Sequence, residues 1–139
     1  MNTESVRDEP IRVLLAKPQH DVHDRGVRLV AKKMRDAGFE VVFINFLLPE
    51  EVVRAAVDED VDVVGISVSA GGHLPIFEDT IAGLSDEGRG DAITIAGGVI
   101  PPRDEEILRS WGVQEVFGPG TNAEQAIEMI ERCVAEGSS

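Results

Sequence analysis

One stretch, IRVLLAKPQHDVHDRG (residues 11–26), decides how the chain folds. Its first six residues are apolar apart from one arginine, which is typical of a buried β-strand. The residues after position 26 show helical periodicity, so the polar segment 17–26 is expected to join a first strand to a first helix. In open α/β sheets, ligands bind at the carboxyl edge of the strands. The sequence therefore predicts a ligand site in residues 17–26.

Strand-like and helix-like segments alternate along the whole chain. A glycine, Gly38, is expected to end the first helix, and Pro49 to begin the second. Residues 61–68 are almost continuously apolar, as in a parallel strand that is covered on both faces. The expected strands are 11–16, 39–46, 61–68, 92–96 and 115–117, and the expected helices are 25–37, 49–57, 73–86, 104–111 and 123–135. This order predicts an α/β fold, a flavodoxin-like (Rossmann-like) doubly wound five-stranded parallel sheet with strand order 2-1-3-4-5.

Length and charge limit the function. The 139 residues fit one domain, expected at 11–136 between flexible termini at 1–10 and 137–139. The formal net charge of -13 argues against a nucleic-acid partner, because binding to phosphates rests on Lys and Arg. The charge is explained by solubility or, as a second possibility, by a salt-adapted host.

Cysteine content and hydropathy predict a cytoplasmic protein. The single cysteine, Cys133, can form no internal disulfide, which favours a reducing compartment. No apolar run approaches the roughly 18 residues of a membrane span. The polar residues 1–10 lack the apolar stretch of a signal peptide. We therefore expect no membrane partner.

Small residues gather in the three loops that follow the later strands. These loops are 67–73 (SVSAGGH), 97–102 (GGVIPP) and 118–121 (GPGT). Each loop alone is explained as a turn, since glycine is common in turns. Three such loops on one edge favour a groove for a bulky, mostly uncharged ligand, because glycine lets the backbone approach a ligand closely. No P-loop and no Gly-x-Gly-x-x-Gly motif is present, so the usual phosphate cradle of nucleotides is missing.

His23 is the candidate metal ligand. Asp21 could accept the proton of one ring nitrogen and leave the other nitrogen free for the metal. Lys17 could pair with the Asp21 carboxylate, and Gly26 would let the helix begin close to a large ligand. One alternative is a loop histidine without a special role, and another is a zinc site formed by His20, Asp21 and His23, which lacks a second ligand cluster. A single imidazole suits a metal that arrives with its other ligands in place.

The pattern Asp21-x-His23-x-x-Gly26, with Ser67 and the loops at 97–98 and 118–121, resembles the cobalamin-binding domain of the methylmalonyl-CoA mutase family. The resemblance covers about residues 11–135. It implies that His23 ligates cobalt in place of the dimethylbenzimidazole base, while the displaced nucleotide tail enters a groove beside the first helix. Asp21 and Lys17 would form the hydrogen-bond relay of His23, and Ser69 stands where the family's Ser-x-Leu pattern has leucine. The cofactor contacts implied in this way are Lys17, Asp21, His23, Asp24, Arg25, Gly26, Ser67, Ser69, Gly71, Gly97, Gly98, Gly118 and Thr121.

The resemblance also implies a function. In this family a (β/α)₈ barrel carries the acyl-CoA site and the radical chemistry, and 139 residues hold no such barrel. The chain is thus expected to be the small, adenosylcobalamin-carrying subunit of an isobutyryl-CoA or 2-hydroxyisobutyryl-CoA type mutase. It would hold no catalytic residue itself and would act only with a barrel subunit that binds the acyl-CoA.

Two alternatives remain. The first is a corrinoid carrier for methyl transfer, which is normally preceded by a helical cap, whereas ten residues precede the first strand here. The second is a signalling receiver of the same fold, which needs a phosphorylatable aspartate after the third strand, where Ser67 stands. Fold analogy alone carries little functional weight.

Overall fold

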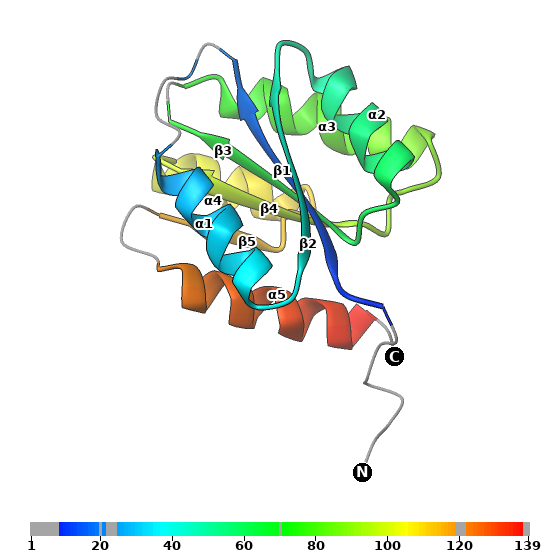
Figure 1. The fold of residues 1–139 in the computed structure, drawn as a ribbon. Coiled ribbons are helices and arrows are strands. Elements are labelled where there is room, and N and C mark those ends of the chain that lie inside the picture. The colour runs from blue at the N-terminus through cyan, green and yellow to red at the C-terminus, as the bar shows by residue number, and fades with distance from the viewer. Residues whose placement is uncertain (1–8, 20, 22–24, 70, 119–121, 138–139) are drawn as a thin grey trace.

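A single sheet with helices on both faces forms the protein (Figure 1). The structure is a computed structural model that describes residues 9–19, 21, 25–69, 71–118 and 122–137. The strands are β1 (Arg12–Pro18), β2 (Glu40–Phe46), β3 (Val63–Val68), β4 (Ile93–Gly98) and β5 (Glu115–Phe117). The helices are α1 (Arg25–Asp36), α2 (Pro49–Glu59), α3 (His73–Asp86), α4 (Pro102–Ser110) and α5 (Ala123–Gly137).

The sheet order is β2-β1-β3-β4-β5, and every pair of neighbouring strands is parallel. The predicted fold class and strand order are therefore confirmed. Ala16 pairs with Ile66 and Ile66 with Ala96, so β1, β3 and β4 end close to one level. Their arrowheads point to the same side in Figure 1, which places the loops after these strands at one edge.

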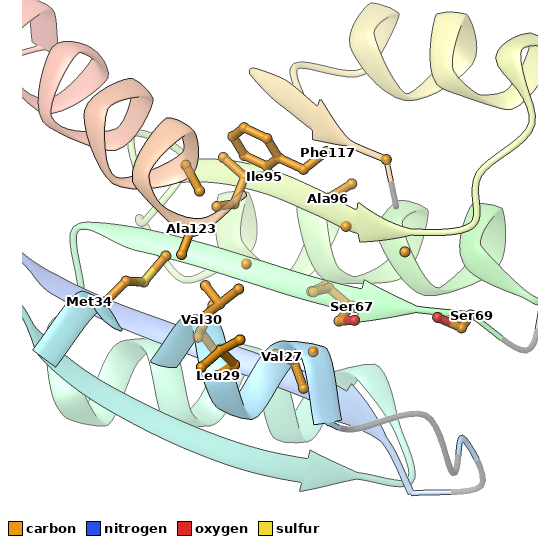
Figure 2. Close-up of a pocket in the computed structure, with 18 of the residues that line it drawn as sticks. Val27, Leu29, Val30, Met34, Ser67, Ser69, Ile95, Ala96, Phe117 and Ala123 are labelled. Atoms are coloured by element: carbon orange, nitrogen blue, oxygen red, sulfur yellow. The ribbon is translucent and has the colours of Figure 1, made fainter. Parts of the chain in front are cut away.

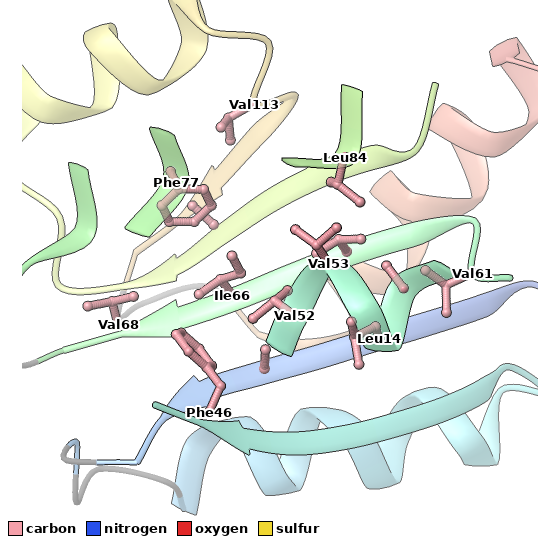
Figure 3. Close-up of a cluster of buried hydrophobic side chains, with 14 of the residues drawn as sticks. Leu14, Phe46, Val52, Val53, Val61, Ile66, Val68, Phe77, Leu84 and Val113 are labelled. Carbon is pink, nitrogen blue, oxygen red and sulfur yellow. The ribbon is translucent and has the colours of Figure 1, made fainter. Parts of the chain in front are cut away.

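Alternate residues of β1 belong to two separate cores. Val13 and Leu15 face α1 and α5, whereas Leu14 and Ala16 face α2, α3 and α4. All four side chains are at most 5% exposed. This two-sided burial explains why β1 is continuously apolar. Figure 3 shows the second core, in which α2, α3 and neighbouring strands contribute Val52, Val53, Ile66, Phe77 and Leu84.

Every predicted boundary lies within two residues of the observed one. Gly38 has φ +99° at the end of α1, and Pro49 lies in the first turn of α2, as predicted. Among the differences of two residues, β1 continues to Pro18 and α4 begins at Pro102 instead of position 104. Proline is tolerated in a first helical turn because its missing N–H would have no partner there.

Candidate functional site

A cavity of about 720 Å³ lies between α1, α5 and the carboxyl half of the sheet (Figure 2). Figure 2 shows side chains of α1 on one side of the cavity and side chains of β4, β5 and α5 on the other. The lining is mostly apolar: Leu15, Gly26, Val27, Leu29, Val30, Lys33, Met34, Gly65, Ile66, Ser67, Ser69, Ile95, Ala96, Gly97, Gly98, Val99, Phe117, Gly118, Asn122, Ala123 and Ala126. A site of this kind suits a large ligand with few charges.

Missing side chains on the sheet create part of this space. Gly65 lies on the same face of β3 as Val63, and Gly97 on the same face of β4 as Ile95, because side chains alternate along a strand. A Cβ atom on Gly65 would lie 2.9 Å from Leu15 Cδ2 and 3.1 Å from Ile95 Cγ1. Among the described residues, a Cβ atom on Gly97 would have only the Phe117 carbonyl oxygen nearby, at 3.9 Å. Gly65 is thus closely packed on the floor, whereas Gly97 faces open volume.

Six of the residues predicted to contact a cofactor line this cavity, namely Gly26, Ser67, Ser69, Gly97, Gly98 and Gly118. Glycine is required at position 98, where φ is +112° and a Cβ atom would overlap the Val68 carbonyl oxygen. Gly71 also has a positive φ, +92°, but it is not among the lining residues. His23, Asp24 and Thr121 lie outside the described residues, as does the side chain of Arg25.

Asp21 is buried at the carboxyl end of β1, with 1% of its surface exposed. Its Oδ2 accepts a hydrogen bond from the backbone N–H of Ser69 at 2.6 Å. Its own N–H donates to the Pro18 carbonyl at 3.0 Å. Burying a carboxylate lowers the stability of the fold unless the carboxylate is hydrogen-bonded. These contacts therefore fix the start of the β1–α1 loop against the end of β3.

Lys17 is buried beside this carboxylate, with 4% of its surface exposed. Its ammonium group donates to the Pro18 carbonyl at 3.2 Å and to the Asp21 backbone carbonyl. The predicted proximity of Lys17 and Asp21 is therefore present, through the Asp21 main chain. The pairing of Lys17 with the Asp21 carboxylate stays a prediction.

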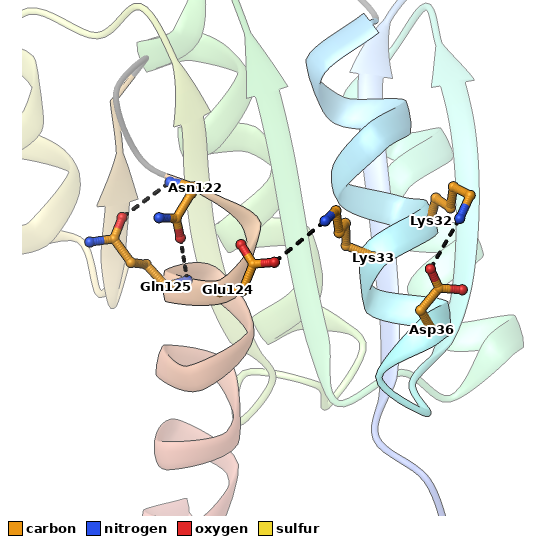
Figure 4. Close-up of polar contacts among 6 residues, drawn as sticks. All are labelled: Lys32, Lys33, Asp36, Asn122, Glu124 and Gln125. Carbon is orange, nitrogen blue, oxygen red and sulfur yellow. Dashed lines mark hydrogen bonds and ion pairs between the residues drawn. The ribbon is translucent and has the colours of Figure 1, made fainter.

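Polar contacts tie α1 to α5 at the cavity (Figure 4). Lys33 Nζ lies 3.5 Å from Glu124 Oε2, and both side chains are largely exposed. Asn122 and Gln125 form a capping box at the start of α5: each side-chain oxygen accepts a hydrogen bond from the backbone N–H of the other residue, at 2.8 Å and 3.1 Å. The pKa of Glu124 is lowered, first by a hydrogen bond from its own backbone N–H and then by the charge of Lys33.

Sequence reasoning missed the apolar walls of the cavity, among them Val27, Val30 and Met34 on α1 and Phe117 on β5. The periodicity of residues 25–37 indicated an apolar helix face but not a hollow in front of it. The available signal was Gly65, since a glycine inside a strand often marks a place where another group approaches the backbone.

The described residues contain neither a metal-binding cluster nor a membrane-spanning helix. No group of three or more His, Cys, Asp or Glu residues in this part of the chain could hold a metal ion. No helix among the described elements is long and apolar enough to cross a membrane. The alternative zinc site falls on residues 20–23, of which only Asp21 is described.

The model of a protein family described as the B12 binding domain matches residues 11–128. The chain belongs to the B12-binding domain family. This B12-binding domain is 46% identical over 127 residues to the 2-hydroxyisobutanoyl-CoA mutase small subunit of Aquincola tertiaricarbonis, covering 91% of the chain and 93% of that subunit. It is 44% identical to the mitochondrial methylmalonyl-CoA mutase of Homo sapiens, over 88% of the chain but only 17% of that enzyme. The resemblance to the mutase family is thereby confirmed.

Solved structures agree with this family. A cobalamin-binding protein from Desulfitobacterium hafniense DCB-2 superposes with a TM-score of 0.72 and 27% identity, over 89% of the B12-binding domain and 59% of that protein. The chemotaxis protein CheY4 of Vibrio cholerae superposes with a TM-score of 0.66 at 18% identity. The second likeness shows the shared fold alone.

Proposed function

We propose that this B12-binding domain is the cobalamin-carrying small subunit of an adenosylcobalamin-dependent acyl-CoA mutase. The observation that carries the proposal is the apolar cavity between α1 and α5, which opens at the sheet edge where Asp21 is buried. The similarity to a mutase small subunit of nearly equal length supports it.

The residues of the cavity fit the nucleotide tail of cobalamin. The volume of about 720 Å³ lies within the range of small-molecule sites. Ser67, Ser69, Asn122 and Lys33 offer polar groups in an otherwise apolar lining, which suits a base and sugar with few charges. Gly97 would let the tail approach β4 closely.

The cobalt ligand is His23, in the segment that follows Asp21. The Asp21 carboxylate would accept a hydrogen bond from the free ring N–H of the imidazole and so orient the ring, a common arrangement for metal-bound histidine. Ser69 and Lys17 hold Asp21 in place from two sides. When bound, the cofactor supplies radicals by homolysis of its cobalt–carbon bond, while the protein supplies binding and orientation.

The acyl-CoA is bound by a larger catalytic partner with a (β/α)₈ barrel. The B12-binding domain corresponds to 17% of the methylmalonyl-CoA mutases it resembles, which supports a separate catalytic part. The working unit is then residues 11–136 together with a barrel subunit in the cytoplasm, and this chain alone isomerises no acyl-CoA. The corrinoid carrier for methyl transfer is the weaker alternative, because the relative matched along almost its whole length is a mutase subunit.

Electron paramagnetic resonance tests the histidine ligation directly. The protein is produced with ¹⁵N-histidine, loaded with adenosylcobalamin and photolysed to the cobalt(II) form. A protein imidazole below cobalt gives a doublet superhyperfine pattern, whereas the unlabelled nucleotide base gives a triplet. His23→Ala should lose the doublet, and the neighbouring His20→Ala should keep it. A triplet in the labelled wild-type protein would disprove the ligation.

A second measurement tests the subunit assignment. Isomerisation of isobutyryl-CoA and 2-hydroxyisobutyryl-CoA is assayed with the loaded protein, with and without a barrel-type mutase subunit. Turnover should require both chains, and turnover by this chain alone would refute the assignment.

A further inference from the structure

A polar pair joins the starts of α3 and α4 and takes no part in the proposed ligation. His73 begins α3, Asp104 lies in the first turn of α4, and His73 Nε2 is 2.5 Å from Asp104 Oδ2. The His73 side chain is 10% exposed and that of Asp104 19%. The pair joins two helix starts that are 31 residues apart in the sequence.

The two helices follow the two loops that line the cavity from β3 and β4. Ser67 and Ser69 precede α3, and Gly98 and Val99 precede α4. The loops begin side by side, because β3 and β4 pair as far as Val68 and Gly98. At that point Gly98 packs directly against the Val68 carbonyl. The loops are thus held at their first residues by the sheet, and the helices that follow them are joined by His73 and Asp104.

The loop that ends at His73 also holds Asp21. Ser69 lies four residues before His73 and donates its backbone N–H to the Asp21 carboxylate. Two contacts therefore flank this loop: His73 with Asp104 at the start of α3, and Ser69 with Asp21 at the end of β3. A shift of the start of α3 would move the Ser69 N–H relative to that carboxylate.

One ring nitrogen of His73 is left without a hydrogen bond. Nδ1 is buried and has no partner among the described residues. A buried polar atom without a partner lowers stability, and in a native structure it calls for an explanation. An apolar pair of the same shape would avoid this loss of stability. The pair is therefore poorly explained by stability alone.

We infer that His73 and Asp104 are positioning residues for cobalamin, which act by holding the β3–α3 loop so that Ser69 keeps Asp21 oriented toward His23. The inference rests on the proposed function, since it concerns the same cobalt site. Neither residue lines the cavity, so both act through Ser69 and Asp21 instead of touching the cofactor.

Four variants separate positioning from folding. Asp104→Ala and His73→Leu remove the contact, whereas Asp104→Asn and His73→Gln each retain a group that can hydrogen-bond the other residue. Thr80→Val is the matched control: Thr80 lies in the same helix, is fully buried and also carries a side-chain oxygen without a partner. Circular dichroism first establishes that each variant is folded.

Cobalamin affinity is measured by absorbance titration. The fraction of histidine-ligated cobalt is measured from the electron paramagnetic resonance spectrum of the ¹⁵N-histidine-labelled protein. Asp104→Ala and His73→Leu should bind about tenfold more weakly, the lower end of the effect of a residue that orients a metal ligand. Their histidine-ligated fraction should fall, while Asp104→Asn, His73→Gln and Thr80→Val stay near the wild type.

The outcomes are distinct. Wild-type affinity and spectrum in folded Asp104→Ala or His73→Leu would overturn the inference and leave the proposed function intact. An equal loss in Thr80→Val would overturn it too, because general loosening of α3 would then explain the effect. If Asp104→Ala does not fold, His73→Leu decides in the same way. If both fail to fold, the pair is structural and the inference falls. A wild-type protein that takes up no cobalamin would refute the proposed function and the inference together.

Discussion

The carboxylate of Asp21 and the backbone N–H of Ser69 are joined by a hydrogen bond of 2.6 Å, which fixes the loop after β1 to the end of β3. These strands are neighbours in the sheet, and the chain leaves them toward opposite faces, to α1 and to α3. The contact therefore lies at the point of an α/β sheet where a ligand crevice is expected.

Replacement of Asp21 should lower the stability of the cofactor-free protein. Asp21→Ala removes a buried acceptor and leaves the Ser69 N–H without this hydrogen bond, which should lower the free energy of unfolding by about 1–3 kcal/mol. Asp21→Asn keeps an oxygen acceptor and should lower it less. Urea unfolding followed by circular dichroism measures both values. Equal stability of Asp21→Ala and the wild type would contradict the proposed anchoring.

A large side chain at position 97 should block the cavity without disturbing the fold. Gly97 faces the open volume, so Gly97→Leu should weaken cobalamin binding by more than about tenfold, which corresponds to 1.4 kcal/mol. Gly90→Leu is the control, because Gly90 lies in an exposed loop and a Cβ atom there would meet Ser85 only at 3.7 Å. Absorbance titration gives the affinities. Unchanged uptake by Gly97→Leu would exclude this cavity as the tail site.

Alanine substitutions at two closely packed glycines should show that cobalamin binding and folding stability can be changed separately. Gly65→Ala places a methyl group against Leu15 and Ile95 on the cavity floor, and Gly83→Ala places one 2.7 Å from Val53 Cγ2 on the opposite face. Overpacking of this kind lowers stability by about 1–3 kcal/mol, which thermal unfolding of both variants would show. Only Gly65→Ala should also weaken cobalamin binding. An equal loss of binding in Gly83→Ala would mean that stability alone controls affinity.

The Glu124 carboxylate, through its backbone hydrogen bond and its contact with Lys33, should stabilise the protein only at a pH where it is ionised. The pKa of Glu124 is lowered in the folded protein, so its contribution is complete above the ordinary glutamate pKa of about 4.3 and disappears as the pH falls through the lowered value. The melting temperature of Glu124→Gln should therefore lie below that of the wild type at neutral pH and converge with it in acid. A difference that persists in strong acid would assign the effect to another cause.

The sequence was sufficient for the sheet and for the side of the molecule that bears the site. Continuous apolarity in residues 61–68 and helical periodicity in residues 25–37 are strong local signals, and the glycines at the end of β4 could be assigned to the carboxyl edge from strand order alone. The cavity itself could not be predicted, because it depends on how closely Val30 and Met34 approach a sheet that lacks side chains at Gly65 and Gly97.

Contacts between distant residues were also beyond the sequence. His73 was expected only to begin a helix, and nothing in the local pattern indicates Asp104 as its partner. Lys17 donates a hydrogen bond to the Asp21 main chain, which no sequence pattern indicated, and its pairing with the Asp21 carboxylate stays a prediction. Backbone carbonyls are present at every residue, so sequence patterns cannot show which of them accepts a bond.

The two faces of the sheet differ in how fully side chains fill the space between the sheet and its helices. The face covered by α2, α3 and α4 is packed with the protein's own side chains, whereas the face covered by α1 and α5 retains a cavity of about 720 Å³. A ligand bound in that space would be buried and would pack against the sheet, α1 and α5 as core side chains do elsewhere. Filling this cavity should therefore raise the free energy of unfolding, by an amount that grows with the ligand concentration relative to its dissociation constant.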